Sequence, residues 1–276
     1  LYLHAAFQGL KESHITRHLV IDEMQDYTPI QFTALNRMFP CQKTILGDYG
    51  QLVNPNHMHS LEDLRSIYAN AWFVELNKSY RSTYEIMSFA KNIRYVSALE
   101  PVKRHGNPPV LIPCLDTADE IRRIMEVIQG FREGENVSLG IILKTDEAAK
   151  GMYEALAGCC GGSQRGGDEA GGDEAGEGRG SQYDMNLITQ ESASFQNGIS
   201  ITSIRMSKGL EFDEVLIPQA DCSTYASDFD RSLLYIACTR AMHRLTLTYS
   251  GKRTEFISPQ LLLECKCNID KHYDLL

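Results

Sequence analysis

The chain has 276 residues, of which 43% are hydrophobic and 23% charged, and its formal net charge is −9. This composition provides a substantial core for one large domain or two smaller ones. The acidic balance excludes a surface that is basic all over, so any contact with nucleic acid has to be local. No apolar run reaches the roughly 18 residues of a membrane span, and residues 1–10 lack the basic flank of a secretory signal. We therefore expect a cytoplasmic protein that does not use a membrane.

The cysteines and the start of the chain give two further expectations. The 8 cysteines are scattered or adjacent, without the spacing of a zinc site, and a disulfide framework belongs to small secreted domains. Reduced thiols are therefore expected. The chain opens at Leu1 without an initiator methionine, directly before a strand-like run. We expect it to be part of a longer protein.

Short β-branched or apolar runs alternate with amphipathic segments along the chain, which is typical of an α/β fold with a largely parallel sheet. The predicted strands are His18 to Asp22, Lys43 to Leu46, Trp72 to Leu76, Val110 to Pro113, Ser138 to Lys144, Gly198 to Ser203, Glu214 to Pro218 and Arg244 to Tyr249. The predicted helices are Ile30 to Met38, Leu61 to Tyr68, Thr83 to Asn92, Thr117 to Gly130 and Asp146 to Leu156, several of them behind Ser, Thr or Asp caps.

Two segments interrupt this alternation. Gly158 to Ser181 is rich in glycine, repeats Gly-Gly-Asp-Glu-Ala and has almost nothing apolar to bury. It is predicted to be a disordered acidic loop, with a docking tail for a basic partner as the less favoured alternative. Pro101 to Pro109 breaks the periodicity with glycine and prolines, which suggests a hinge.

The first candidate site follows the first predicted strand. Residues 18–26 read HLVIDEMQD, so Asp22 and Glu23 come where a parallel strand ends and presents side chains to ligands. Asp22 could hold Mg²⁺ through water, and Glu23 could polarise a water that attacks a phosphate. The alternative is that the acidic pair only caps the following helix.

Two more segments place polar groups at strand ends. Residues 43–51 read KTILGDYGQ and bring Gln51 beside the first carboxylates if the two strands are neighbours. An amide there could sense a γ-phosphate, although an ordinary strand and turn is the simpler interpretation. Residues 76–83 read LNKSYRST, where Arg81 could neutralise a phosphoryl group or could be a plain surface arginine.

The last two segments lie in the C-terminal half. Residues 201–218 read ITSIRMSKGLEFDEVLIP, which predicts a strand, a short helix carrying Lys208 and Glu211, and another strand. Lys208 and Ser207 could hold phosphates, and Glu211 could bind a hydroxyl. Residues 233–247 read LLYIACTRAMHRLTL, a helix with Arg240 near its end followed by a strand. Arg240 is either a second arginine finger or a cation at a helix terminus.

The order of these segments is more specific than any one of them. Together DEMQD, GDYGQ, SYRS, SKGLEF and CTRA resemble motifs II to VI of UvrD/Rep-type superfamily 1 helicases. The resemblance implies a RecA-like fold of the P-loop NTPase type, in which two domains clamp ATP and move 3′ to 5′ along a DNA strand. It predicts residues 1–100 as the end of the first motor domain, and residues 101–276 as the second.

The resemblance also implies individual roles. Asp22 would be the Mg²⁺ carboxylate, Glu23 the catalytic base and Gln51 the γ-phosphate sensor. Arg81 and Arg240 would reach the γ-phosphate of ATP, and Glu211 would contact the ribose. Ser207, Lys208 and Arg205 would lie on the nucleic-acid side, with Arg205 standing where unwinding enzymes of the family have a histidine.

Several departures from the family pattern narrow the prediction. The sequence contains no GxxxxGK[ST] phosphate-binding loop, so this chain alone is expected not to hydrolyse ATP. The residues after Gln51 lack the base-stacking aromatic, and the segment between Arg81 and Lys208 is too short for a duplex-engaging insertion. The pattern is similar to helicase IV and to the Gram-positive RNA polymerase recycling ATPases. We therefore keep a DNA helicase or translocase as the first hypothesis and ATP-driven release of RNA polymerase as the alternative, with an inactive scaffold as the third.

Overall fold

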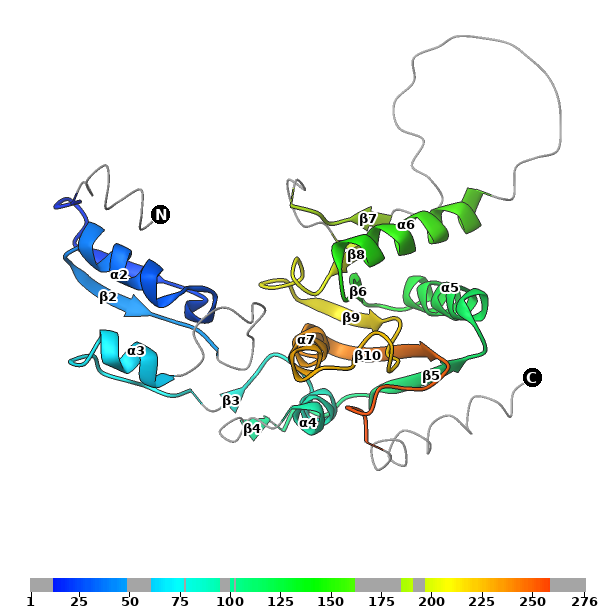
Figure 1. Cartoon of the computed structure of the whole chain (residues 1–276). Helices are drawn as coiled ribbons and strands as arrows, with labels where there is room; N and C mark the ends of the chain where they lie inside the picture. The colour runs from blue at the N-terminus through cyan, green and yellow to red at the C-terminus, as the bar shows by residue number, and fades with distance from the viewer. Residues whose placement is uncertain are drawn as a thin grey trace, which may run out of the picture. The chain divides into compact units, whose positions relative to one another are not determined.

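The computed structural model describes residues 12–48, 61–76, 78–94, 100–101, 103–161, 185–190 and 197–258. The chain divides into two compact units, Leu1–Asn77 (unit 1) and Lys78–Leu276 (unit 2), whose elements are labelled in Figure 1. This division comes before the predicted domain boundary at residue 100. The reason is that helix α4 (Tyr84–Ile93) packs against α7 (Asp228–Cys238) and β10 (Ala241–Ser250), which are elements of unit 2.

Unit 1 contains a two-stranded parallel sheet covered by two helices. Strand β1 (His18–Ile21) pairs with β2 (Gln42–Ile45), and a 3-10 turn, η1 (Met24–Asp26), follows β1. Helix α2 (Pro29–Met38) starts where Thr28 and Gln31 cap each other's backbone N–H groups, a device that the predicted start one residue later did not include. Ile21, Phe32 and Leu64 form the core between the sheet, α2 and α3 (Leu61–Ile67).

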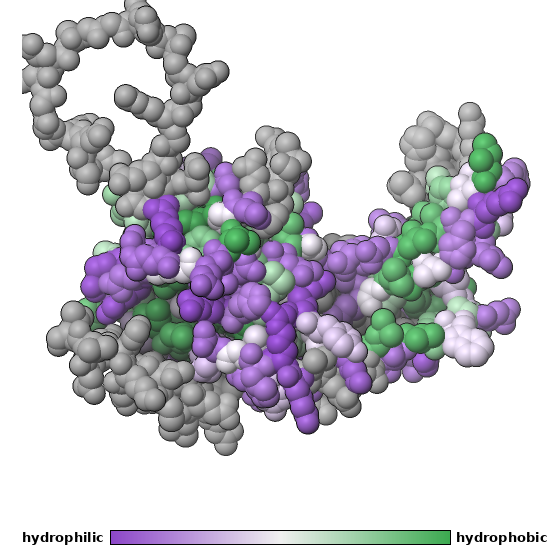
Figure 2. All heavy atoms as spheres, turned by 180° about the vertical axis from the view of Figure 1, so that it is seen from behind, coloured by the Kyte–Doolittle hydropathy of each residue, from purple (hydrophilic) through white to green (hydrophobic). Residues whose placement is uncertain are grey.

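The predicted strand Trp72 to Leu76 is not formed, and residues 71–76 have no regular secondary structure. Trp72 is 92% exposed and Leu76 is 85% exposed. Their apolar composition favours a strand, but a strand forms only where another strand accepts its backbone hydrogen bonds. Exposed apolar side chains also occur on the strand side of unit 1, at Val20 and Leu46. Figure 2 shows hydrophobic residues interspersed with hydrophilic ones on the face that it presents.

Unit 2 is built on a six-stranded sheet with the order β5-β10-β9-β6-β8-β7, in which every neighbouring pair is parallel. Its strands are β5 (Val110–Cys114), β6 (Ser138–Leu143), β7 (Met185–Leu187), β8 (Gly198–Ser203), β9 (Phe212–Ile217) and β10. A second short parallel pair joins β3 (Lys78–Ser79) to β4 (Glu100–Pro101). The parallel sheet confirms the predicted fold class, while β3, β4 and β7 were too short to stand out from the sequence.

Helices cover both faces of the sheet of unit 2. Helix α5 (Thr117–Glu133) packs against α6 (Asp146–Gly161), and α4 packs against α7. Asp116 caps α5 and Ser227 caps α7 through their side-chain oxygens. All six residues of the central strand β6 are buried, as expected for a strand with helices on both faces. Ile124, Leu139 and Ile201 belong to the apolar cluster between α5, α6 and the strands.

Three predicted features differ from the structure of unit 2. The short helix expected around Lys208 is a series of turns over residues 204–209, and Gly209 has a φ of +81° that an α-helix does not accommodate. Helix α6 continues to Gly161, so the first residues of the predicted acidic loop are helical. The rest of that loop, residues 162–181, lies outside the described residues.

The predicted hinge at Pro101 to Pro109 is held to α4 in its middle part. The Tyr84 N–H donates to the Arg104 carbonyl over 2.8 Å, and the Gly106 N–H donates to a Glu85 carboxylate oxygen over 2.9 Å. The His105 ring lies 2.8 Å from the same carboxylate. These contacts fasten residues 104–106 to the helix, so the hinge prediction is wrong for this part of the segment.

The thiol prediction can be checked for part of the chain. Cys41, Cys114, Cys159, Cys222 and Cys238, the cysteines among the described residues, are all free thiols. Burial raises the pKa of the Cys114 thiol to about 11, with a smaller contribution from nearby Glu120 and Asp119. In the described ranges, no helix combines the length and apolar character needed to cross a membrane.

Candidate functional site

The predicted carboxylates of unit 1 lie where β1 ends. Asp22 is exposed, and one of its carboxylate oxygens accepts the Glu23 N–H over 2.8 Å. Glu23 has a left-handed backbone, with φ 52° and ψ 48°, which is uncommon for a residue other than glycine, aspartate or asparagine. Such conformations occur preferentially at functional sites, because the surrounding structure has to hold them. The backbone supports a ligand-facing role at this strand end without identifying the ligand.

The second predicted segment lies beside the first, because β1 and β2 are neighbours. The Met24 N–H donates to the Leu46 carbonyl over 2.9 Å, immediately before Gly47. A Cβ on Gly47 would lie 2.4 Å from the Met24 side chain and 2.5 Å from the Gln25 amide oxygen. The absence of a side chain at Gly47 therefore permits the contact. The predicted adjacency is confirmed as far as Asp48, whereas Gln51 lies outside the described residues.

Gln25 joins these two segments, although the sequence pattern indicates no role for it. It is fully buried, its amide nitrogen donates to a Glu23 carboxylate oxygen over 2.5 Å, and its amide oxygen accepts the Asp48 N–H over 3.0 Å. A buried polar side chain with both groups bonded is a structural requirement of its surroundings. The signal in the sequence was a polar residue in an otherwise buried turn, which is too weak to interpret without the fold.

In unit 2 the structure brings two predicted site residues into contact. The Arg81 guanidinium lies 2.5 Å from a Glu211 carboxylate oxygen, with the two side chains 46% and 35% exposed. Arg81 follows β3, and Glu211 directly precedes β9. An ion pair that is this exposed adds about 0–1 kcal/mol of stability, so it can be opened by a ligand at low cost.

Arg240, the other predicted arginine, is only 1% exposed. Its Nε donates to the Ile236 carbonyl near the end of α7 over 3.2 Å, and its guanidinium also bonds the Leu210 carbonyl and the Thr239 hydroxyl, each over 3.4 Å. A cation at the C-terminus of a helix satisfies carbonyl groups and favours the helix dipole. This geometry agrees with the interpretation of Arg240 as a cation at a helix terminus. To act as an arginine finger, Arg240 would have to replace these hydrogen bonds with bonds to a phosphate.

Hydrogen bonds to backbone carbonyls connect the segments that carry Arg81, Glu211 and Arg240. The buried Ser82 hydroxyl donates to the Ala241 carbonyl over 2.6 Å, across 159 positions of sequence. The Phe212 N–H donates to the Arg240 carbonyl over 3.0 Å. Both contacts lie where the parallel strands β9 and β10 begin. These predicted residues therefore form one cluster, which we call the arginine cluster.

A polar network borders the arginine cluster. Arg104 donates to the Arg81 carbonyl over 3.2 Å and contacts the His243 ring over 2.9 Å. The His243 ring also lies 3.8 Å from an Asp213 carboxylate oxygen, whose carboxylate accepts the Ser138 N–H over 3.0 Å. Arg104 lies inside the predicted hinge segment, and no local pattern indicates its role because its partners are distant in the sequence.

The residues predicted to contact nucleic acid occupy different environments. Ser207 is fully buried, and its hydroxyl donates to the Ile204 carbonyl over 2.8 Å. Arg205 is exposed and Lys208 is half-buried. Of the three, Arg205 and Lys208 present charge at the surface, and Ser207 stabilises the turn that carries them.

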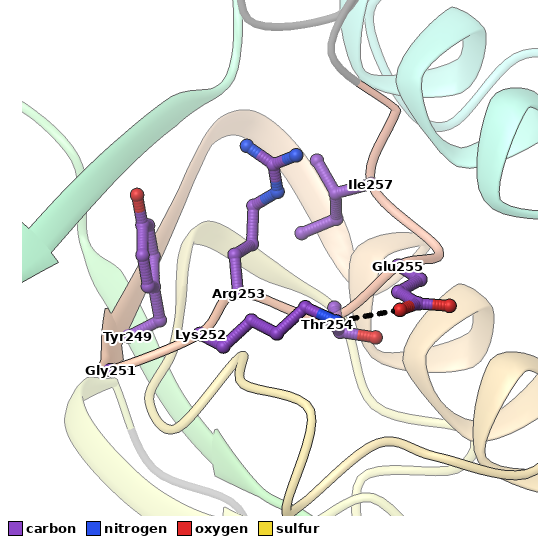
Figure 3. A pocket seen from close by; sticks show the side chains of 7 residues that line it. All are labelled: Tyr249, Gly251, Lys252, Arg253, Thr254, Glu255 and Ile257. Carbon is purple, nitrogen blue, oxygen red and sulfur yellow. Dashed lines mark hydrogen bonds and ion pairs between the residues drawn. The ribbon is translucent and has the colours of Figure 1, made fainter.

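The pocket shown in Figure 3 lies away from the arginine cluster. It has a volume of about 400 Å³ and is lined by residues at and after the end of β10, including Tyr249, Arg253 and Ile257. The Lys252 amine pairs with a Glu255 carboxylate oxygen over 2.8 Å beside it. None of the predicted site residues lines this pocket. Within the described ranges no three His, Cys, Asp or Glu side chains come together as a metal site.

Comparison with known proteins agrees with the motif order. Residues 198–248 match the family described as the UvrD-like helicase C-terminal domain, and they contain Glu211 and Arg240. Among solved structures, the chain is similar to the C-terminal domain of a possible DNA helicase from Lactobacillus plantarum WCFS1. The TM-score is 0.50 and the identity 24%, over 66% of this chain and 96% of that one. No curated protein matches the chain.

These findings confirm the resemblance to the C-terminal portion of a UvrD/Rep-type superfamily 1 helicase and the RecA-like fold. They do not distinguish the branches of that group. The similarity to helicase IV and the polymerase recycling ATPases stays a prediction.

Proposed function

We propose that this chain, which carries the C-terminal portion of a UvrD/Rep-type superfamily 1 helicase, is the part of a DNA motor that responds to ATP. ATP hydrolysis would drive movement along a DNA strand in the 3′ to 5′ direction, and the complete motor requires a phosphate-binding loop that this sequence does not contain.

The observation that carries the proposal is the Arg81–Glu211 ion pair. These residues come from two separate predicted segments, residues 76–83 and residues 201–218. The structure brings their side chains within 2.5 Å of each other. Glu211 lies inside the segment that matches the helicase family, and Arg81 does not. A contact between them therefore supports a shared site that the family match alone does not cover.

The chemistry of the cluster suits a nucleotide. A guanidinium is planar and always charged, and it binds phosphate oxygens in a bidentate manner, so a half-exposed Arg81 is suited to a γ-phosphate. Glu211 would release Arg81, and its carboxylate would accept a hydrogen bond from a ribose hydroxyl. Arg240 would add a second positive charge. When the Arg240 guanidinium reaches the transferring phosphoryl group, this charge would stabilise it.

The carboxylates of unit 1 fit a magnesium ion that is shared with phosphates. Mg²⁺ keeps several waters and uses only one or two protein carboxylates when it binds with a nucleotide. Asp22 is exposed at the strand end and provides such a group. The bound ion would neutralise phosphate charge, and Glu23 would orient and deprotonate the attacking water.

Nucleic acid is the proposed partner on the side of Arg205 and Lys208. Both side chains lie in the turns between β8 and β9, and Glu211 lies at the end of the same segment. A conformational change at the nucleotide would therefore reach the contacts with DNA phosphates through a short segment, the eight residues from position 204 to position 211. The net charge of −9 restricts such contacts to a local patch.

The proposal is tested in the protein that joins this chain to a phosphate-binding loop. We expect DNA-stimulated ATP turnover that falls roughly 10²-fold or more in Arg81→Ala, because a charge acting on the transferring phosphoryl group is removed. The matched control is Arg122→Ala, which removes an exposed arginine from the surface of α5, where it pairs with Asp119 and Glu126. Equal turnover in both variants would contradict the assignment of Arg81.

A second measurement compares stimulation by single-stranded DNA with stimulation by stalled RNA polymerase complexes. Stronger stimulation by DNA, accompanied by strand movement, supports the translocase proposal. Stronger stimulation by the polymerase complexes, without strand separation, would favour ATP-driven polymerase release instead.

A further inference from the structure

Gln25 is a buried polar residue that the proposed chemistry does not use. It lies in the middle of η1, is 0% exposed, and bonds two segments separated by 23 positions. A glutamine side chain exposes two donors and an acceptor at its end, so burying it is costly unless these groups are bonded. The partners of Gln25 therefore decide what the residue is for.

Those partners are the candidate catalytic carboxylate and the backbone of the second motif. The amide nitrogen of Gln25 donates to Glu23 Oε2 over 2.5 Å, and its amide oxygen accepts the Asp48 N–H over 3.0 Å. Glutamate at position 25 has no donor in its ionised form, and leucine has neither group. The two bonds together require an amide.

The backbone of Glu23 shows why a clamp is needed. Its left-handed conformation is unfavourable for a residue with a Cβ and persists only where surrounding contacts impose it. The Asp22 carboxylate holds the Glu23 N–H, and Gln25 holds the Glu23 side chain. Gly47 lies close to the Gln25 amide oxygen, since a Cβ added at Gly47 would meet this oxygen at 2.5 Å.

We propose that Gln25 is a positioning residue that orients the Glu23 carboxylate and fastens it to the start of the second motif at Asp48. The inference rests on the proposed function in that it takes Glu23 as the general base. Gln25 does not touch the reacting atoms. It sets the direction of Glu23 and couples that direction to the backbone at positions 47–48.

The test compares variants at position 25 with Gln129→Leu, which removes an amide–carboxylate hydrogen bond of similar length, from Gln129 to Glu133, on the exposed surface of α5. In the protein that joins this chain to a phosphate-binding loop, Gln25→Leu should lower kcat for ATP roughly 10²-fold, with KM changed less than about threefold, because the base is misdirected while ATP contacts remain.

Gln25→Glu is the second variant, because it keeps the shape of the side chain. A second carboxylate beside Glu23 disfavours its ionised form, so the rise of kcat with pH should move to higher pH. A residue needed only for folding would not produce this shift. Wild-type kcat in Gln25→Leu, or an unchanged pH profile in Gln25→Glu, overturns the inference.

A measurement on the 276-residue chain itself separates this inference from the proposed function. Hydrogen exchange at the Asp48 amide should accelerate about tenfold or more in Gln25→Leu, because the amide loses its acceptor, and should not change in Gln129→Leu. Unchanged exchange refutes the clamp whether or not the protein hydrolyses ATP. Accelerated exchange, together with no ATP turnover in the protein that joins this chain to a phosphate-binding loop, would support the clamp and reject the motor.

Discussion

One of the two candidate carboxylates of unit 1 is exposed, whereas one of the two candidate arginines of unit 2 is almost completely buried. Asp22 is exposed at the end of a two-stranded sheet, and Arg240 is 1% exposed beside a six-stranded sheet. A charge can be placed in an interior only when polar groups replace its hydration. The carbonyls at the end of α7 supply those groups in unit 2, so the larger core there can hold a charge that the small sheet of unit 1 leaves in water.

Both units also share a feature. In each, a buried polar side chain that carries no charge joins the motif segments: Gln25 in unit 1 and Ser82 in unit 2. We infer that motif residues are held in place by hydrogen bonds inside each unit, between segments that are distant in the sequence. The following predictions test this, from the largest expected effect to the smallest.

Arg240→Ala should have the largest effect. In a motor with a phosphate-binding loop we expect kcat to fall roughly 10³-fold with nucleotide binding nearly intact, as for a charge that acts in the transition state. The free energy of unfolding should also fall by about 2 kcal/mol, because the Ile236 and Leu210 carbonyls lose a donor. Turnover assays, nucleotide titration and denaturant unfolding measure these effects.

The control for Arg240 is Arg244→Ala on β10, the strand that begins directly after Arg240. The Arg244 side chain is half-exposed and lies 3.5 Å from a Glu214 oxygen. It should change neither quantity appreciably. Wild-type turnover in Arg240→Ala would leave the residue with only the helix-terminal role.

Gly47→Ala should destabilise unit 1. Its Cβ would lie 2.8 Å from the Met24 backbone nitrogen, which cannot move without breaking the contact between the two motifs. We expect a loss of roughly 2 to 3 kcal/mol, typical of overpacking. Gly151→Ala in α6, where an added Cβ meets nothing within 4 Å, should instead gain up to about 1 kcal/mol. Denaturant unfolding that shows equal effects would contradict the close contact at Gly47.

Ser82→Ala tests whether the arginine cluster depends on its backbone connection. Removing the hydroxyl leaves the buried Ala241 carbonyl without this donor and should cost roughly 1 to 2 kcal/mol. Thr254→Ala removes a similar buried bond, to the Tyr225 carbonyl over 2.9 Å, away from the cluster. Both variants should lose stability in thermal unfolding, but only Ser82→Ala should also reduce ATP turnover. Equal turnover in the two would separate the cluster from catalysis.

The smallest expected effect is on the pH dependence of the stability of unit 2, in the variant Asp230→Asn. Burial raises the pKa of Asp230, but bonds from Lys144, Ser227 and Ala226 outweigh it and hold the pKa below its ordinary value. A lowered pKa in the folded state gives stability that is present above the unfolded pKa and is lost as pH falls below about 4. Asp230→Asn should therefore cost about 1 kcal/mol at pH 7 and progressively less at low pH. A constant difference between pH 7 and pH 3 would contradict this.

Local patterns predicted most of the regular elements well. The strands at His18, Ser138 and Gly198 and the helices from Thr117 and Asp146 begin at the predicted residues, because alternation, apolar periodicity and caps are properties of neighbouring residues. The strand predicted at Trp72 failed because β-propensity says nothing about whether a partner strand is present. The helix predicted around Lys208 failed because Gly209 takes a conformation that apolar periodicity does not record.

By itself, the sequence determined the parallel α/β architecture and the order of the motifs that carry the charged residues. Only the tertiary structure decided which of those residues meet. It paired Arg81 with Glu211, enclosed Arg240 against α7, and placed Gln25 between Glu23 and Asp48. The physical reason is that the burial and partners of a side chain depend on segments tens to hundreds of positions away, whereas helix and strand formation depends mainly on residues close in sequence.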